Sequence, residues 1–106
     1  MRNLWASNAG RNPSVGWFGI FNFVNNVVYN WVHRSVDGGD YRAMFNMVNN
    51  YYKPGPATPS GTHYFFNQSL QRDGATSLGP SKWHFSGNIM EGDDAVTADN
   101  WKGFKN

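Results

Sequence analysis

Large apolar side chains alternate with polar ones in three short segments, and each segment ends in asparagine. Residues 21–26 read Phe-Asn-Phe-Val-Asn-Asn and residues 45–50 read Phe-Asn-Met-Val-Asn-Asn, so five of six positions are identical in the two copies. Residues 83–88, Trp-His-Phe-Ser-Gly-Asn, form a weaker third copy. Alternation at a period of two predicts strands with one buried face. An apolar pair follows each copy, so the pattern predicts that the chain bends at the asparagines and continues.

The spacing of the copies is typical of folds in which similar units stack on one another. Asparagine tolerates the left-handed backbone region better than most residues, which suits a tight bend. If the units stack in register, Asn26, Asn50 and Asn88 lie above one another, and their amides can hydrogen-bond along the stack. The repeats therefore favour an all-β solenoid of about four turns. The alternative is a chance similarity between two β-hairpins.

Loop-forming sequence separates the second and third copies. The interval there is longer than the interval between the first two copies, and its Pro-, Gly- and Ser-rich parts predict a loop insertion around residues 54–80, with a short strand at residues 63–67. Residues 4–8, Leu-Trp-Ala-Ser-Asn, are a candidate earlier copy of the repeat. Residues 1–106 are thus predicted to form a single partial solenoid domain. Neither end shows a clear polar cap, so we expect more turns in a longer protein.

Composition agrees with an all-β fold and excludes several classes of function. Aromatic residues make up 17% of the chain and charged residues 15%, which argues against disorder and against a helical bundle. The net charge is only +2, without a run of Lys or Arg, so no nucleic-acid partner is expected. The chain has no cysteine, and no apolar run of about 18 residues predicts a membrane span.

Several blocks of the sequence resemble bacterial pectate lyases of polysaccharide lyase family 1. The blocks are Asn-Leu-Trp-Ala at 3–6, Arg-Asn-Pro at 11–13, Asn-Asn-Val-Val-Tyr-Asn-Trp at 25–31, Asn-Asn-Tyr-Tyr-Lys-Pro-Gly-Pro-Ala-Thr at 49–58 and Gly-Asn-Ile-Met-Glu-Gly at 87–92. The resemblance implies a right-handed parallel β-helix and calcium-dependent β-elimination of polygalacturonate or pectin, an acidic polysaccharide.

The family signature is Arg-x-Pro-x-x-Arg, and the chain matches it only in part. Arg11 matches the arginine that takes the C5 proton of a galacturonate, and Pro13 matches the proline. The second arginine of the signature binds substrate, and its position is occupied here by Gly16. This difference leaves one contact to a substrate carboxylate unaccounted for.

The calcium ligands of the family lie before the arginine signature. Only ten residues precede Arg11, and none of them is acidic. The resemblance therefore implies that calcium is bound outside this chain, and we expect the isolated chain to be inactive. The family's role implies a secreted, extracellular or periplasmic protein, although no signal peptide is recognisable near Met1.

Other residues are candidates for binding substrate. Proton removal beside a carboxylate builds up negative charge, so cations are needed around it. Arg34, Arg42 and Lys53 lie beside loops or strand ends, and arginine and lysine bind carboxylates well. Their alternative role is a solvated surface. The three histidines have no partners at metal-ligand spacing and are interpreted as structural: His33, His63 and His84.

Three functions therefore remain open from the sequence. The first is the C-terminal part of a pectate lyase, inactive as an isolated chain. The second is a non-catalytic carbohydrate-binding β-solenoid module. The third is a structural solenoid without a ligand. Arg11 in the Arg-Asn-Pro block favours the first over the third, while the missing calcium ligands favour the second for the isolated chain.

Overall fold

The protein is all-β, with its strands in parallel sheets and little helix. The computed structural model describes residues 2–15, 19–38, 43–68 and 82–105. Sheet A contains β1 (Leu4–Ala6), β4 (Val27–Tyr29), β7 (Tyr51–Lys53) and β10 (Ile89–Met90). Sheet B contains β2 (Ser14–Val15), β5 (Val36–Gly38), β8 (Phe66–Gln68) and β11 (Phe104–Lys105). Sheet C contains β3 (Gly19–Val24), β6 (Ala43–Val48) and β9 (Lys82–Ser86). The described helices are α1 (Asp94–Ala98) and the 3-10 helix η2 (Asn100–Gly103).

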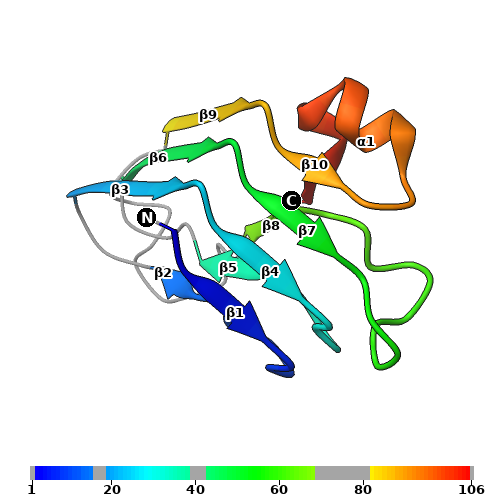
Figure 1. Cartoon of the computed structure of the whole chain (residues 1–106). Coiled ribbons are helices and arrows are strands. Elements are labelled where there is room, and N and C mark those ends of the chain that lie inside the picture. Colours follow the sequence, from blue (N-terminus) through cyan, green and yellow to red (C-terminus); the bar gives the residue numbers. More distant parts are fainter. Residues whose placement is uncertain (1, 16–18, 39–42, 69–81, 106) are drawn as a thin grey trace.

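Successive strands pass from sheet A to sheet B to sheet C and back to sheet A (Figure 1). Every pair of neighbouring strands is parallel. In sheet C, Phe21 pairs with Phe45 and Phe45 with Trp83, so the three sequence copies lie in register. The predicted alternation is confirmed, because Phe23 and Phe85 are buried on the inner side of this sheet.

The core lies between the sheets and is rich in aromatic rings. Phe45 stacks on Trp83 with ring centroids 4.1 Å apart, and Phe66 of sheet B meets both rings edge-on. Tyr52 of sheet A packs against Phe65, 4.7 Å away. Full burial of such a side chain is worth about 1.5–3 kcal/mol, so these rings are the main apolar link between the sheets.

A ladder of asparagine side chains follows the bend between sheets C and A, as the sequence predicted. Asn50 Oδ1 accepts hydrogen bonds from the backbone N and from Nδ2 of Asn26, at 2.9 and 3.2 Å. Asn88 Oδ1 accepts the equivalent two bonds from Asn50, at 3.0 and 2.9 Å. The preceding residues Asn25 and Asn49 adopt left-handed φ angles of 56° and 53°. The first asparagine of each pair therefore makes the bend, and the second joins the ladder.

The candidate earlier copy at residues 4–8 is wrong in its register. Leu4 pairs with Val27, so residues 4–6 follow the bend instead of preceding it. Asn3 is the residue beside Asn26, and its backbone N donates to Asn26 Oδ1 at 3.0 Å. The physical reason is that the bend sets the register of the strands. The alignment of residues 4–8 with the later copies matched apolar residues and did not match the position of the bend.

The two short helices lie beyond β10 at one end of the stacked strands (Figure 1). Asn100 of η2 extends the ladder, because its Oδ1 accepts from the backbone N and Nδ2 of Asn88 at 2.9 and 3.0 Å. Asp93 caps the N-terminus of α1 by accepting from Val96 N. The sequence pattern does not predict these two helices.

The predicted insertion around residues 54–80 lies partly outside the described residues, which exclude 69–81. Its described part packs on the turn before it: Asn30 Oδ1 accepts from Ala57 N at 2.7 Å, and Trp31 Nε1 donates to Thr62 O at 3.0 Å. The strand expected at residues 63–67 occurs later, at Phe66–Gln68. Among the described residues, no helix is long and apolar enough to cross a membrane.

Candidate functional site: a groove lined by two arginines

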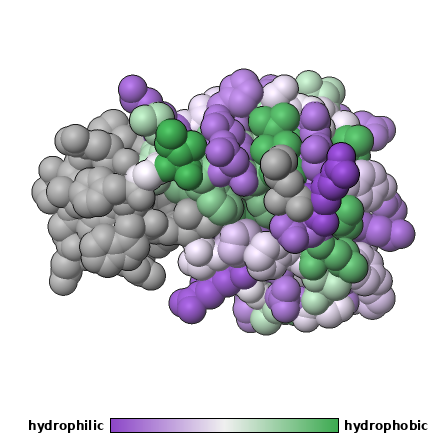
Figure 2. Space-filling view, turned by 60° about the vertical axis from the view of Figure 1, so that its left-hand side comes forward, coloured by the Kyte–Doolittle hydropathy of each residue, from purple (hydrophilic) through white to green (hydrophobic). Residues whose placement is uncertain are grey.

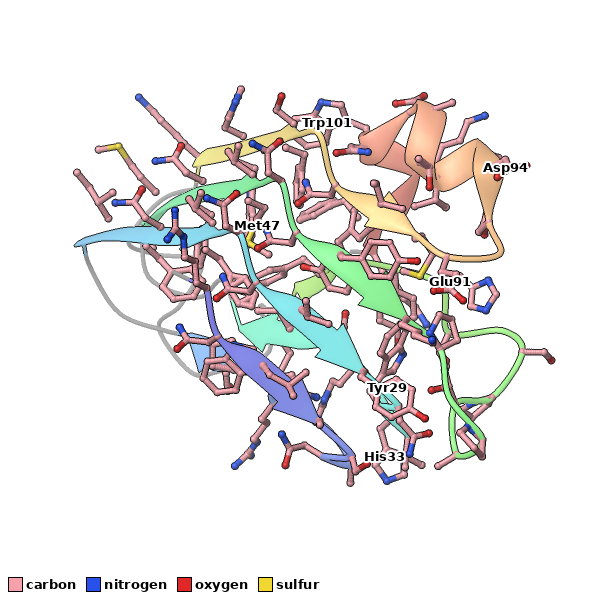
Figure 3. All side chains as sticks on the ribbon, viewed as in Figure 1. Tyr29, His33, Met47, Glu91, Asp94 and Trp101 are labelled. Carbon is pink, nitrogen blue, oxygen red and sulfur yellow. The ribbon has the colours of Figure 1, made fainter. Side chains whose placement is uncertain are left out.

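A groove of about 590 Å³ lies on the turns that lead from sheet A to sheet B. Its lining comes from β1 and the segment that follows it, and from the segment after β4. Its lining residues are Trp5, Asn8, Ala9, Gly10, Arg11, His33 and Arg34. Figure 3 shows His33 beyond Tyr29, at the end of β4, and remote from Asp94 of α1. Sequence reasoning proposed Arg11 and Arg34 separately, and the structure brings them to one site.

The two segments run side by side because their backbones are hydrogen-bonded. His33 N donates to Ala9 O at 2.6 Å, and Asn12 N donates to Ser35 O at 2.9 Å. Asn12 is buried, and its Nδ2 donates to Arg34 O at 3.3 Å. These bonds attach the segment that carries Arg11 to the segment that carries Arg34.

Arg11 and Arg34 occupy equivalent positions on neighbouring turns. The strand pairs on both sides of the groove have the same offset along the chain, since Leu4 pairs with Val27 and Ser14 with Asp37. Arg11 and Arg34 are separated by this same offset. Backbones paired in this way are about 4.8 Å apart. The side chains of Arg11 and Arg34 are therefore attached at neighbouring positions on the two segments.

The two arginines differ in their surroundings. Arg11 is exposed, its φ is +59°, and the bond between Asn12 and Pro13 is cis. Among the residues that the structure describes, no ion pair involves Arg11. Arg34 Nε lies 2.7 Å from Asp37 Oδ2, and the side chain of Asp37 is only 7% exposed. The groove therefore contains one paired and one unpaired cation within the described region.

Residues of the next turn support the wall of the groove. Tyr64 is buried, and its hydroxyl donates to His33 O at 2.9 Å. Burial raises the pKa of Tyr64, and the positive charge of Arg34 partly offsets this rise. The neutral phenol thus remains a donor at ordinary pH and holds the backbone of His33 in place.

The other predicted binding residues lie elsewhere. Lys53 is exposed on β7 and does not line the groove. Arg42 and Gly16 lie outside the described residues. The role of Lys53 in binding stays a prediction.

Two of the histidines also lie away from the groove. His63 Nδ1 lies 3.4 Å from Asp93 Oδ2 at the helical end of the molecule. His84 is exposed on β9, opposite Asn46 of β6. His33 is the histidine that lines the groove, although the sequence had suggested only a structural role for it.

Sequence reasoning missed Asp37, Trp5 and His33 as parts of this site. The signal that could have found them is the equal offset between Arg11 and Arg34 and between their flanking strands. With that register, Trp5 and Asp37 fall beside the same two turns.

The groove can bind anions but offers no ligand set for a metal ion. Guanidinium groups form paired hydrogen bonds with carboxylates. Calcium needs six to eight oxygen ligands, largely carboxylates. Within the described part of the chain, no carboxylate lines the groove, and no group of three or more His, Cys, Asp or Glu could hold a metal. The chemistry available to this site is therefore the binding of a negatively charged group.

Comparison with known proteins gives relatives of one kind. No family model matches the chain. A probable pectate lyase C of Neosartorya fischeri is 41% identical over 63 residues, which cover 54% of this chain and 14% of the relative. Probable pectate lyase C of Aspergillus terreus is 40% identical over 76 residues, covering 60% and 17%. The Aspergillus flavus protein of the same name is 40% identical over 60 residues, covering 54% and 14%.

This chain contains a pectate-lyase-like region. The family resemblance seen in the sequence is thus confirmed for part of the chain, although these relatives are fungal whereas the blocks resembled bacterial enzymes. The chain spans only about a seventh of the length of the curated relatives it matches. The activity of full-length pectate lyases is therefore only proposed for this chain.

Proposed function

We propose that this chain is part of a pectate lyase that cleaves polygalacturonate, and that its two-arginine groove binds the carboxylates of that polymer. The observation that carries the proposal is the meeting of Arg11 and Arg34 in one groove of a pectate-lyase-like region. A polymer with a carboxylate on each sugar suits a groove whose described lining residues include two guanidinium groups and no carboxylate.

We also propose that the fold is a segment of a right-handed parallel β-helix. In support, the chain visits sheets A, B and C in a repeating order, and all strand pairs are parallel. The asparagine ladder connects each turn to the next along the same corner. Further turns in a longer protein would extend the groove along the direction in which Arg11 and Arg34 follow one another.

The proposed reaction is a β-elimination with Arg11 as the base. Arg11, in its neutral form, takes the proton from C5 of a galacturonate. The electron pair left on C5 forms a C4–C5 double bond as the C4–O bond breaks. The departing oxygen leaves with its electron pair and is protonated. The free arginine side chain is a cation at ordinary pH, so this role requires an alkaline medium or a cationic neighbourhood. Because Arg34, one turn away, is paired with Asp37, the proposed role of Arg11 relies on an alkaline medium.

Calcium is proposed for the whole protein only. The described residues contain no group of three or more His, Cys, Asp or Glu that could hold it, and no step of the proposed reaction in this chain passes through calcium. Any such ion would be held by other parts of a longer protein, and the isolated chain is proposed to bind its substrate without turning it over.

The first experiment measures binding of the substrate by the isolated chain. Titration of the chain with trigalacturonate by calorimetry should show saturable binding that weakens as salt is added, because the contacts are between charges. Arg11→Gln should weaken binding about tenfold, the effect of losing one strong charge-assisted bond. Lys102→Gln, an exposed cation on η2, is the matched control and should bind like the parent chain. Equal affinity of the Arg11→Gln and parent chains would reject the proposed site.

Catalysis needs a longer protein that contains this segment. There, Arg11→Lys should lose most turnover of polygalacturonate, followed by the absorbance of the unsaturated product, while substrate binding is retained. Retained turnover would remove Arg11 as the base.

The alternative is a non-catalytic carbohydrate-binding module, and the observation that favours it is the absence of a metal-ligand set among the described residues. The same absorbance assay on the longer protein, with and without calcium, distinguishes the two. Binding with no unsaturated product in either condition would favour the module.

A further inference from the structure

We infer that Asp37 is a positioning residue that orients the guanidinium of Arg34 for a substrate carboxylate. This inference rests on the proposed function, since it assumes that the groove binds a uronate polymer. Asp37 does not line the groove, so its effect on binding would pass through Arg34.

The position of the Asp37 carboxylate is fixed by the sheet around it. Asp37 lies in β5, which has β2 on one side and β8 on the other. Its backbone N donates to Pro13 O at 3.1 Å, so it is also linked to the segment that carries Arg11. The side chain is 7% exposed, and Oδ2 lies 2.7 Å from Arg34 Nε. The contact is an ion pair, since Arg34 Nε is buried and has no hydrogen-bond partner among the described residues. The attraction of the fixed carboxylate still limits where the guanidinium can lie.

The ion pair with Asp37 leaves the terminal N–H groups of Arg34 available to a ligand. A guanidinium carries five N–H donors in a planar fork, and one of them is on Nε. The two terminal nitrogens carry the other four, and paired N–H groups of this kind match the two oxygens of a carboxylate. The Arg34 side chain is 40% exposed and lines the groove. The guanidinium is therefore held by charge on the side of Nε, and its outer edge can bind a carboxylate.

Asp37 also explains how two arginines can lie one turn apart. Like charges on neighbouring strands repel each other and would drive the long side chains apart. The carboxylate of Asp37 compensates the charge of Arg34, and Arg11 keeps its net charge within the described region. The groove thus combines a preorganised, compensated guanidinium with a free one.

A purely structural role for Asp37 must be separated from positioning. Asp37 Oδ1 is buried and has no hydrogen-bond partner among the described residues, so Arg34 is the cation that the structure gives this carboxylate. Replacing Arg34 alone leaves a buried charge without its partner. The informative set is therefore Asp37→Asn, Arg34→Gln and the double variant Arg34→Gln/Asp37→Asn, in which both charges are removed together.

The test is a double-mutant cycle on binding of trigalacturonate and of its fully methyl-esterified form, measured by calorimetry on the whole chain. Asp37→Asn should weaken binding of the acid about tenfold and leave the ester unchanged. In the Arg34→Gln background it should have no further effect, because it acts through Arg34. In the Arg11→Gln background its effect should persist in full.

Other results overturn the inference. These are unchanged or tighter binding of the acid by Asp37→Asn, an equal loss for acid and ester, or an effect that remains when Arg34 is already replaced. If Asp37→Asn does not fold, the variant Arg34→Lys is tested in its place. A lysine can pair with Asp37 but has no planar set of N–H groups left to bind a substrate carboxylate. Parent-like affinity of Arg34→Lys would then reject positioning. No binding by the parent chain itself would reject the proposed function, and the inference with it.

Discussion

Asn50 lies at the bend between sheets C and A, and its side chain forms hydrogen bonds to the neighbouring turns of the chain on both sides. It is 1% exposed, and its Nδ2 donates to Phe23 O at 2.7 Å and to Asn88 Oδ1 at 2.9 Å. Its Oδ1 accepts from two nitrogens of Asn26. Every hydrogen-bonding group of this amide is therefore used within the protein. Such a buried network is costly to break, because each lost partner leaves another buried polar group unsatisfied.

Asn50→Ala should therefore lower the free energy of unfolding by about 2–4 kcal/mol. Chemical denaturation followed by tryptophan fluorescence measures this. Asn22→Ala is the matched control, because Asn22 is exposed on sheet C and accepts one bond from Asn46 Nδ2 at 2.8 Å. Its cost should be below about 0.5 kcal/mol. A similar small loss for both variants would mean that the buried ladder does not stabilise the fold.

Tyr52 is a second buried polar residue, but one without a partner. Its hydroxyl has no hydrogen bond among the described residues, and burial raises the pKa of Tyr52 well above its ordinary value of 10.0. The folded protein therefore keeps this proton, whereas the unfolded chain loses it near pH 10. The contribution to stability is complete below that pH and falls as the pH rises above it.

Tyr52→Phe should remove part of this alkaline loss. Urea denaturation from pH 8 to 11 should show a shallower fall in the variant than in the parent, with equal or slightly higher stability at pH 8, since an unsatisfied hydroxyl is removed. Some slope will remain, because the pKa values of Tyr51 and Tyr64 are also raised. Identical slopes in both proteins would contradict a buried, protonated Tyr52.

At the scale of elements, the short helices close one end of the stack. α1 contains five residues, which is too few for a helix that is stable alone, so it depends on its contacts. Val96 is its buried side chain, and Asn100 of η2 completes the asparagine ladder. Asp93 accepts from Val96 N at 3.2 Å and also lies 3.4 Å from His63. One carboxylate thus connects the helix to the segment before β8.

Asp93→Ala should cost about 1 kcal/mol through the lost cap, measured by chemical denaturation. Asp94→Ala is the neighbouring control, since Asp94 lies in the exposed first turn and should cost only about 0.3 kcal/mol. Hydrogen exchange at the Val96 amide should accelerate in Asp93→Ala and not in Asp94→Ala. Equal exchange in the two variants would exclude the cap.

At the scale of the whole molecule, the strands differ in how many neighbours they have. The described residues extend over 38 × 24 × 24 Å, and β1, β2 and β3 each pair with a strand on one side only within this region. The strands β6 and β7 pair on both sides. The surface is mixed, and Figure 2 shows hydrophobic side chains between hydrophilic ones. Among the described residues, the exposed large hydrophobics are Leu4, Ile20, Val27, Met44, Ile89 and Trp101.

Native-state hydrogen exchange should follow this difference. In a parallel strand, alternate amides point to opposite neighbours, so about half the amides of β3 lack a ladder partner in the described region, while those of β6 have one on each side. We expect the amides of residues 44–48 to exchange at least tenfold more slowly than the alternate, unpaired amides of residues 20–24. Uniform protection of the two strands would contradict the observed pairing.

The sequence by itself determined the parts of this protein that repeat. Alternation fixed the inner face of sheet C, and paired asparagines fixed the corner, because both depend on residues close together in the chain. Only the tertiary structure decided the register of the first turn, the helices that cover β10, and the pairing of Arg34 with Asp37 beside Arg11. These depend on contacts between turns that lie far apart in the sequence, or on short segments whose own preference is weak, and local pattern carries little information about either.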